Sequence, residues 1–192
     1  MIYTTYNLAV KHNACERALE SWDKHVGGIK KFGADTPIPL TDILEVLGID
    51  DCLWAFRAVQ DEEVADTIIL KFLTAVADKW LIHFESKYPQ DKRPCKAFKA
   101  LRDYFLNPSY KAAVAVDSAY KEAIKADLSK DDRDYLWLLA GGDWTYSSYC
   151  GSRFRSAYND RWYAASTIGG RALSEAEKKW QTAKLQELLE EA

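Results

Sequence analysis

Hydrophobic positions recur at helical spacing along nearly the whole chain. Between Val64 and Phe84, apolar side chains return every four residues and so lie on one face of a long helix. No stretch of four or more residues alternates cleanly between β-branched and polar side chains, as a half-buried strand would. The pattern therefore predicts an all-α protein, a single bundle of about eight or nine helices.

Cap and turn signals divide this pattern into separate helices. We expect side-chain caps from Asn13, from Asp50 or Asp51, from Asp61, from Ser129 or Asp131, and from Ser174. Gly27-Gly28 would end the first of these helices, and Tyr88-Pro89 the longest. Residues 109–128 are rich in alanine, which lets neighbouring helices in the C-terminal two thirds approach closely.

The organisation of the chain is predicted to be simple. It contains no low-complexity tract and no internal repeat, so residues 1–192 are expected to form one all-α domain. If there is a subdivision, residues 1–60 form an N-terminal helical cap on a helical core of residues 61–192. The loop around residues 27–40 would then be the linker.

Composition narrows the class of protein further. With 48% hydrophobic and 13% aromatic residues, the chain is not intrinsically disordered, and a formal net charge of −3 argues against a surface that binds nucleic acid all round. The four cysteines form no CxxC pair and lie in apolar helix faces, which predicts small buried side chains in a reducing compartment. The start of the chain lacks a basic stretch followed by an apolar one, and charged residues interrupt the longest apolar run. We expect a cytoplasmic protein without a membrane span.

Signatures of enzymes and metal sites are absent from the sequence. It has no HExxH, GxSxG, GKS or GxGxxG motif and only three histidines. His12 and Cys15 have the spacing of two metal ligands, but no second cluster is present to complete a tetrahedral site. We therefore expect no catalytic residue, no metal and no cofactor.

The segment 143–163 has the most unusual composition in the chain, with seven aromatic and three arginine side chains. At 100° per residue, Tyr146, Tyr149 and Arg153 fall opposite the face of Phe154 and Trp144. Three interpretations remain open. The helix is buried on both sides, or one face binds a protein, or its tyrosines and arginines stack on single-stranded nucleic acid.

A group of acids lies where two predicted helices meet, and its candidate binding residues are Asp50, Asp51, Glu62 and Glu63. Carboxylates in the first turn of a helix favour its positive end, so these residues fit ordinary capping. They would also fit a surface that mimics nucleic acid and faces the basic cleft of a nuclease.

The turn YPQDKRP joins the longest helix to the next one. Pro94 suits the first position of a helix, and Asp91 can cap that helix. Arg93 can reach back to the last carbonyls of the long helix or across to Asp51. Tyr88, Asp91 and Arg93 are therefore predicted to form a structural corner, with an exposed contact site as the alternative.

From Leu70 to Phe105 the chain reads LKFLTAVADKWLIHFESKYPQDKRPCKAFKALRDYF. This stretch, with the alanine-rich helices after it, resembles a helical family of immunity proteins found beside bacterial toxin genes and in phage genomes. The segments KHNACERALESW and DDCLWAFRAV look like parts of phage-encoded proteins. The sequence departs from the family pattern in its last third, where alanine repeats give way to Trp and Tyr.

The resemblance implies a non-enzymatic protein that inhibits a protein effector by stoichiometric binding. An immunity protein would bind a toxin. An anti-CRISPR-like counter-defence protein would bind a defence nuclease complex. Such a protein acts in the bacterial or phage-infected cytoplasm. The alternative is a nucleic-acid-binding accessory protein that uses segment 143–163.

Overall fold

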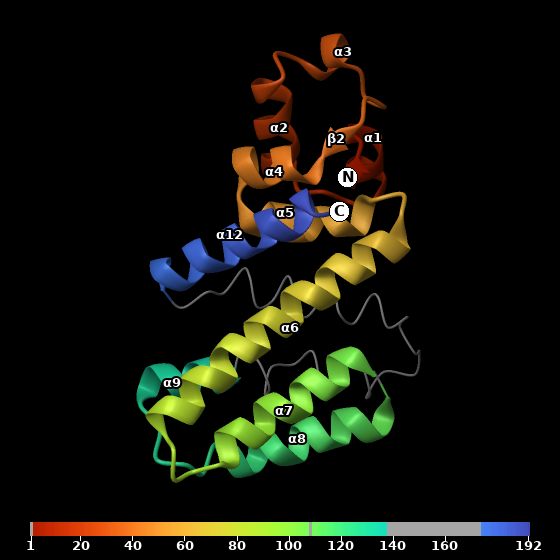
Figure 1. The fold of residues 1–192 in the computed structure, drawn as a ribbon. Coiled ribbons are helices and arrows are strands. Elements are labelled where there is room, and N and C mark those ends of the chain that lie inside the picture. Colours follow the sequence, from red (N-terminus) through yellow and green to blue (C-terminus); the bar gives the residue numbers. More distant parts are fainter. Residues whose placement is uncertain (1, 108, 138–173) are drawn as a thin grey trace. The chain divides into compact units, whose positions relative to one another are not determined.

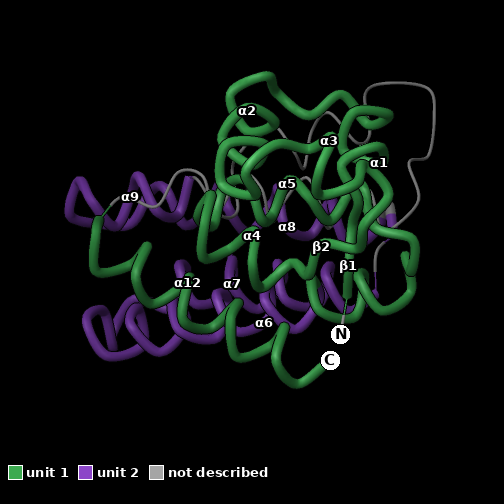
Figure 2. The backbone as a smooth tube through the Cα atoms, turned by 90° about the horizontal axis from the view of Figure 1, so that it is seen from above, with its two compact units in different colours: residues 1–69, 174–192 green, residues 70–173 purple. Residues whose placement is uncertain are grey.

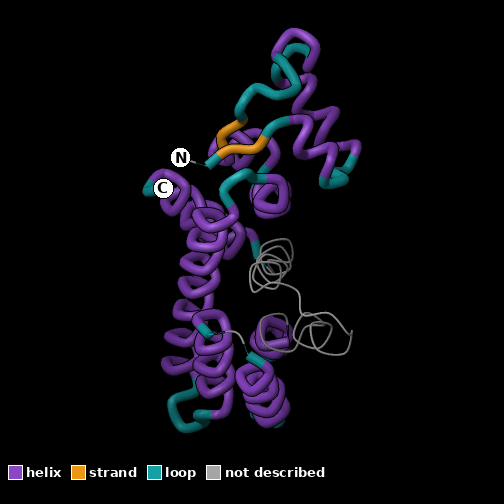
Figure 3. Tube along the Cα trace, turned by 90° about the vertical axis from the view of Figure 1, so that its right-hand side faces the viewer, coloured by secondary structure: helices purple, strands orange, loops and turns teal. Residues whose placement is uncertain are grey.

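The fold is almost entirely helical. The structure, a computed structural model, describes residues 2–107, 109–137 and 174–192 (Figure 1). Within these ranges the regular elements are helices apart from two strands of two residues each, shown in orange in Figure 3. The all-α prediction is confirmed. Over the described ranges the structure has ten α-helices rather than eight or nine, because several short ones precede residue 60.

The chain divides into two compact units (Figure 2). Unit 1 comprises residues 1–69 and 174–192, and unit 2 comprises residues 70–173. Helix α6 (Glu62–Lys87) begins in unit 1 and continues into unit 2. Unit 1 is therefore formed from two segments that are far apart in the sequence.

Unit 1 is built from short helices around a minimal sheet. Its elements are β1 (Tyr3–Thr4), α1 (Tyr6–Lys11), α2 (Glu16–His25), α3 (Ile29–Phe32), β2 (Ile38–Pro39), α4 (Leu40–Leu47), α5 (Ile49–Ala55), the 3₁₀ helix η1 (Phe56–Ala58) and α12 (Glu175–Glu190). Strands β1 and β2 pair antiparallel, with Tyr3 opposite Pro39 and Thr4 opposite Ile38. Strands this short show no alternation of polar and apolar residues, so sequence pattern does not reveal them.

The core of unit 1 lies where α4, α5 and α12 pack together. Leu40, Leu53 and Phe56 are fully buried there, and so is Leu185 of α12. Residues from both segments of the unit thus share one core. The last helix completes the core that the first 60 residues begin.

Unit 2 contains most of α6 together with α7 (Arg93–Leu106), α8 (Tyr110–Ala123) and α9 (Lys130–Leu136). Helices α7 and α8 lie side by side (Figure 1). The predicted stripe on α6 is buried at Phe72, Val76 and Phe84, and Phe84 stacks on Phe98 of α7 with 5.1 Å between ring centroids. Aromatic packing thus joins α6 to α7.

The predicted helix starts are confirmed where a polar side chain caps the first turn. The Asp61 carboxylate accepts from the Val64 N–H, Ser129 Oγ from the Asp132 N–H, and Ser174 Oγ from the Glu177 N–H. Helix α6 also ends at Lys87, directly before the predicted Tyr88-Pro89 stop.

Two predicted caps are wrong. Asn13 has a φ of 62° and lies between α1 and α2, so α2 starts at Glu16 without a side-chain cap. Asp50 and Asp51 are inside the first turn of α5, whose N-cap is Gly48. In both places a short helix ends just upstream. Asn13 itself reverses the chain, whereas Gly48 does so before α5, which therefore starts earlier than predicted.

The cysteines differ in exposure. Cys52 and Cys95 are free and buried, as predicted. The prediction is wrong for Cys15, which is free and exposed at the start of α2, and Cys150 lies outside the described residues. The apolar face of α2 buries Trp22 instead.

Candidate functional site

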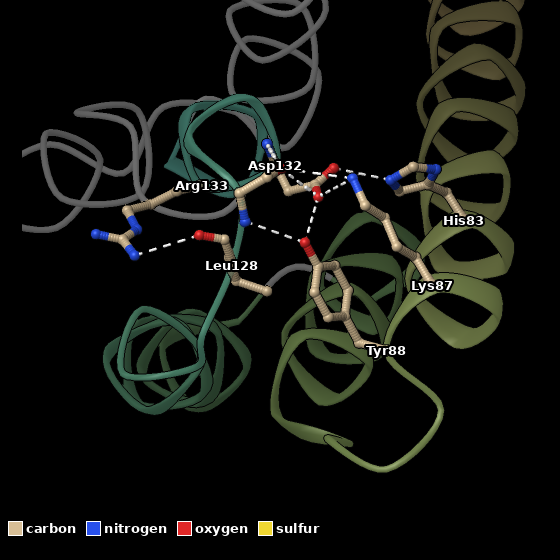
Figure 4. A network of polar contacts seen from close by, with 7 residues as sticks. His83, Lys87, Tyr88, Leu128, Asp132 and Arg133 are labelled. Atoms are coloured by element: carbon tan, nitrogen blue, oxygen red, sulfur yellow. Dashed lines mark hydrogen bonds and ion pairs between the residues drawn. The ribbon is translucent and has the colours of Figure 1, made fainter.

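A polar cluster in unit 2 brings four side chains to one buried carboxylate. At its centre is Asp132, which is 3% exposed and lies in the first turn of α9 (Figure 4). Its carboxylate interacts with four side chains: His83 Nε2 at 2.8 Å, Lys87 Nζ at 2.6 Å, Ser129 Oγ at 2.6 Å, and Tyr88 Oη. The Tyr88 oxygen also accepts a hydrogen bond from the Ser129 N–H at 3.0 Å. The cluster joins the C-terminal end of α6 to the N-terminal end of α9.

The electrostatics of this cluster keep Asp132 ionised. Burial by itself would raise the pKa of its carboxyl group. Hydrogen bonds that stabilise the charged form outweigh burial, and the pKa of Asp132 is well below its usual value; the bonds come from Lys87, Ser129, Tyr88 and His83. The pKa of Lys87 is raised in turn, chiefly by its hydrogen bond to Asp132.

The chemistry open to this cluster is limited by how its groups are engaged. The Ser129 hydroxyl donates to Asp132 and accepts from the Asp132 N–H, so it serves as the cap of α9. Lys87 is an ammonium group paired with a carboxylate and is a poor general base. These hydrogen bonds and ion pairs therefore hold α6 and α9 together.

Sequence reasoning recognised Ser129 and Tyr88 but missed Asp132 as a centre. The spacing of Ser129 and Asp132 matches a capping box, which is the local signal in the sequence. His83, Lys87 and Tyr88 contact Asp132 only because the fold brings distant segments together, so no local sequence pattern indicates these contacts.

The predicted corner residues have separate partners in the structure. Tyr88 belongs to the Asp132 cluster, whereas Arg93 forms a forked ion pair with Asp91, with Nη2 at 2.6 Å from Oδ2. Asp91 also accepts from the Arg93 N–H at 3.0 Å and so helps to start α7, and its pKa is lowered chiefly by the Arg93 side chain. Within unit 2, Asp91 thus engages the guanidinium of Arg93. These contacts fit the structural corner.

The four acidic candidates of unit 1 fall into two kinds. Asp51 accepts a forked pair of hydrogen bonds from Arg17 at 2.6 and 2.8 Å, and Asp50 lies 3.3 Å from Lys178 of α12. Glu62 and Glu63 are exposed in the first turn of α6. The ion pairs offset much of the charge at Asp50 and Asp51, so Glu62 and Glu63 carry the more available charges.

Acids exceed bases in unit 1 as a whole. Residues 1–69 hold twelve acidic and six basic side chains, and residues 174–192 hold five and three. The whole chain has 29 acidic and 26 basic side chains, so unit 2 has the opposite balance, with twelve acids and seventeen bases. The small net charge of the chain therefore conceals an acidic unit and a basic one.

A cavity of about 240 Å³ lies inside unit 1. Asp50 and Asp51 are among its lining residues, together with Cys15, Trp22 and Trp54. Two of the acidic candidates thus border a mainly apolar cavity, which the sequence does not indicate because its walls come from separate segments.

The remaining candidates, Trp144, Tyr146, Tyr149 and Arg153, lie outside the described residues. In the part that the structure describes, no group of three or more His, Cys, Asp or Glu side chains is placed to hold a metal ion. No helix among the described residues combines the length and the hydropathy that crossing a bilayer requires.

Comparisons of the chain with models of known protein families, with curated proteins and with solved structures each return no match.

Proposed function

We propose that this protein is a non-enzymatic inhibitor that binds a protein effector through the acidic surface of unit 1. The acid excess of that unit is the observation that carries the proposal. Such a surface attracts proteins with a basic cleft and repels nucleic acid, so it favours nucleases and other nucleic-acid-binding effectors as targets. An immunity protein for a toxin and a phage anti-CRISPR-like protein both act in this way, in the bacterial cytoplasm.

The exposed acids at the start of α6 are the best placed part of this surface. Glu62 and Glu63 project from a first turn whose N-terminus Asp61 caps, so the helix holds them in fixed positions. Pre-positioned charges raise the association rate with a basic partner. Asp50 and Asp51 contribute less, because Lys178 and Arg17 are their nearest partners.

Affinity capture from the cells that encode the protein tests this proposal. The tagged chain should retain one basic, nucleic-acid-binding protein at a one-to-one ratio, identified by mass spectrometry, and added DNA or RNA should release it. The double charge reversal Glu62→Lys/Glu63→Lys should lower capture roughly tenfold and flatten its dependence on salt.

The matched control is Asp103→Lys/Asp127→Lys, which makes the same charge change at two exposed acids of unit 2. It should capture the partner as the unmodified protein does. If the Glu62/Glu63 variant binds its partner with unchanged affinity and salt dependence, the acidic surface is not the binding site.

The second candidate is a nucleic-acid-binding accessory protein, which the excess of basic residues in unit 2 favours. Gel-shift titrations with single-stranded DNA and RNA at rising salt separate the two candidates. Binding at micromolar protein that falls steeply with salt supports this second function, and the absence of a shift removes it.

A further inference from the structure

The cavity in unit 1 has walls of aromatic and aliphatic side chains. Tyr6 of α1, Trp22 of α2 and Trp54 of α5 line it, together with small side chains such as Ala18 and apolar ones from β2 and α4. Every one of these elements belongs to unit 1. The cavity is therefore a feature of one compact unit and is formed by its own packing.

The size of the cavity suits a small molecule. An apolar cavity of about 150 Å³ in another protein holds benzene, and ligand pockets start at roughly 300 Å³. At about 240 Å³, this cavity has room for one flat bicyclic ring and little more. Burying such a ring between indole and phenol side chains is favoured by both hydrophobic transfer and ring stacking.

The charged side chains on the lining are both acidic. Asp50 and Asp51 border the cavity, whereas their basic partners Lys178 and Arg17 are not among the residues that line it. A cation inside the cavity would therefore meet carboxylates and aromatic faces, which attract it, and no ammonium or guanidinium group on the lining. An anion would find neutral donors such as Asn13 and Thr5 but no cationic side chain on the lining.

We infer that this cavity is a binding site for a small aromatic amine, a molecule with a flat ring for the Trp22 and Trp54 walls and an ammonium group for Asp50 and Asp51. The inference goes beyond the proposed inhibitor function, because it concerns a small molecule and a cavity rather than a protein and a surface.

Calorimetric titration with three compounds that share the indole ring tests the site. Tryptamine carries an ammonium group, indole carries no charge, and indole-3-propionate carries a carboxylate. Tryptamine should bind with one-to-one stoichiometry and roughly tenfold more tightly than indole, and indole-3-propionate should bind most weakly. Equal affinities for the three compounds, or no binding of tryptamine, would overturn the inference.

Two pairs of variants assign the binding to this cavity. Ala18→Leu fills it and should abolish tryptamine binding, whereas Ala112→Leu, at a similarly half-buried alanine of α8, should leave binding unchanged. Asp50→Asn/Asp51→Asn should erase the preference for tryptamine over indole-3-propionate, and Glu62→Gln/Glu63→Gln should preserve it. If Ala112→Leu rather than Ala18→Leu abolishes binding, the amine binds outside this cavity. The same follows if Glu62→Gln/Glu63→Gln rather than Asp50→Asn/Asp51→Asn erases the preference.

A measurement on the unmodified chain guards against variants that fail to fold. Cys15 lines the cavity and is exposed, so a bound amine should slow its alkylation by iodoacetamide, followed by mass spectrometry of the peptide that contains it. Saturating tryptamine should slow this reaction at least threefold, and indole-3-propionate should leave it unchanged. An alkylation rate that tryptamine does not alter contradicts a ligand in this cavity.

Discussion

Asp132 is a single side chain on which two helices depend. A buried carboxylate is costly without partners, and here hydrogen bonds from α6 and from the residue that caps α9 compensate that cost. The same contacts make the residue hard to replace, because a neutral side chain leaves the Lys87 ammonium group without its counter-ion and Tyr88 without a charged acceptor.

We predict that Asp132→Asn lowers the free energy of unfolding by about 2–4 kcal/mol, since it breaks a buried network from one side. Urea denaturation followed by circular dichroism measures this change. Asp131→Asn is the matched control, because Asp131 is the exposed neighbour in the same first turn and should cost under about 0.5 kcal/mol. Equal losses for the two variants would show that the cluster contributes no stability.

The pH dependence of stability follows from the lowered pKa of Asp132. The pKa of an Asp in an unfolded chain is about 3.9, and the pKa of Asp132 in the folded protein lies below that value. This group therefore stabilises the fold fully above a pH of about 5. The stabilisation is lost as the pH falls through the folded pKa. Thermal unfolding between pH 7 and 3 should therefore show a shallower acid loss for Asp132→Asn than for the unmodified chain, and parallel curves would contradict this.

At the residue scale, sequence reasoning succeeded where a contact is local. The caps from Asp61, Ser129 and Ser174 involve atoms three positions apart, and the pattern of donors and acceptors is visible in the sequence. It failed at Asp51, whose partner Arg17 is 34 residues away. Choosing one partner among many exposed bases requires the fold.

At the scale of elements, the junction between α4 and α5 depends on Gly48. Its backbone has a φ of 89° and a ψ of 179°, a conformation that is essentially restricted to glycine. Gly27 differs, because it follows α2 in a Schellman turn, where the Gly28 N–H bonds to the Asp23 carbonyl and the Gly27 N–H to that of Lys24. Asn tolerates the left-handed position of that turn.

The same substitution should therefore have different effects at the two glycines. Gly48→Asn is expected to lower the free energy of unfolding by about 1–3 kcal/mol, and Gly27→Asn by under about 1 kcal/mol. Denaturant titrations of both variants provide the comparison. A larger loss at Gly27 than at Gly48 would mean that the α4–α5 junction relaxes without strain.

The long elements were predictable and the short ones were not. Helices α6 and α7 repeat their apolar spacing over several turns, so chance matches are rare and the buried stripes agree with the pattern. The α-helices of the first 60 residues are only four to ten residues long, and the same residue types favour the start, the end and the turn between such helices. Asn13 illustrates this, because a residue that favours both caps and left-handed turns was assigned to the wrong one.

At the scale of the molecule, the two units should respond separately to local damage. Asp132→Asn should raise the rate of hydrogen exchange in peptides covering residues 83–88 and 129–136, because those segments lose the contacts that hold them together. Residues 40–55 in the core of unit 1 should keep their protection, measured by mass spectrometry. A uniform increase over all peptides would show that the chain opens as one cooperative body.

The discontinuity of unit 1 has a consequence for the order in which the chain is made. A ribosome releases residues 1–69 well before α12, which supplies the buried Leu185, Leu188 and Leu189. Unit 2 emerges in between as one continuous segment and can fold while synthesis is still under way. The apolar surfaces of α4 and α5 therefore stay exposed to chaperones until α12 leaves the exit tunnel. A premature stop codon just after residue 173 would leave these surfaces uncovered.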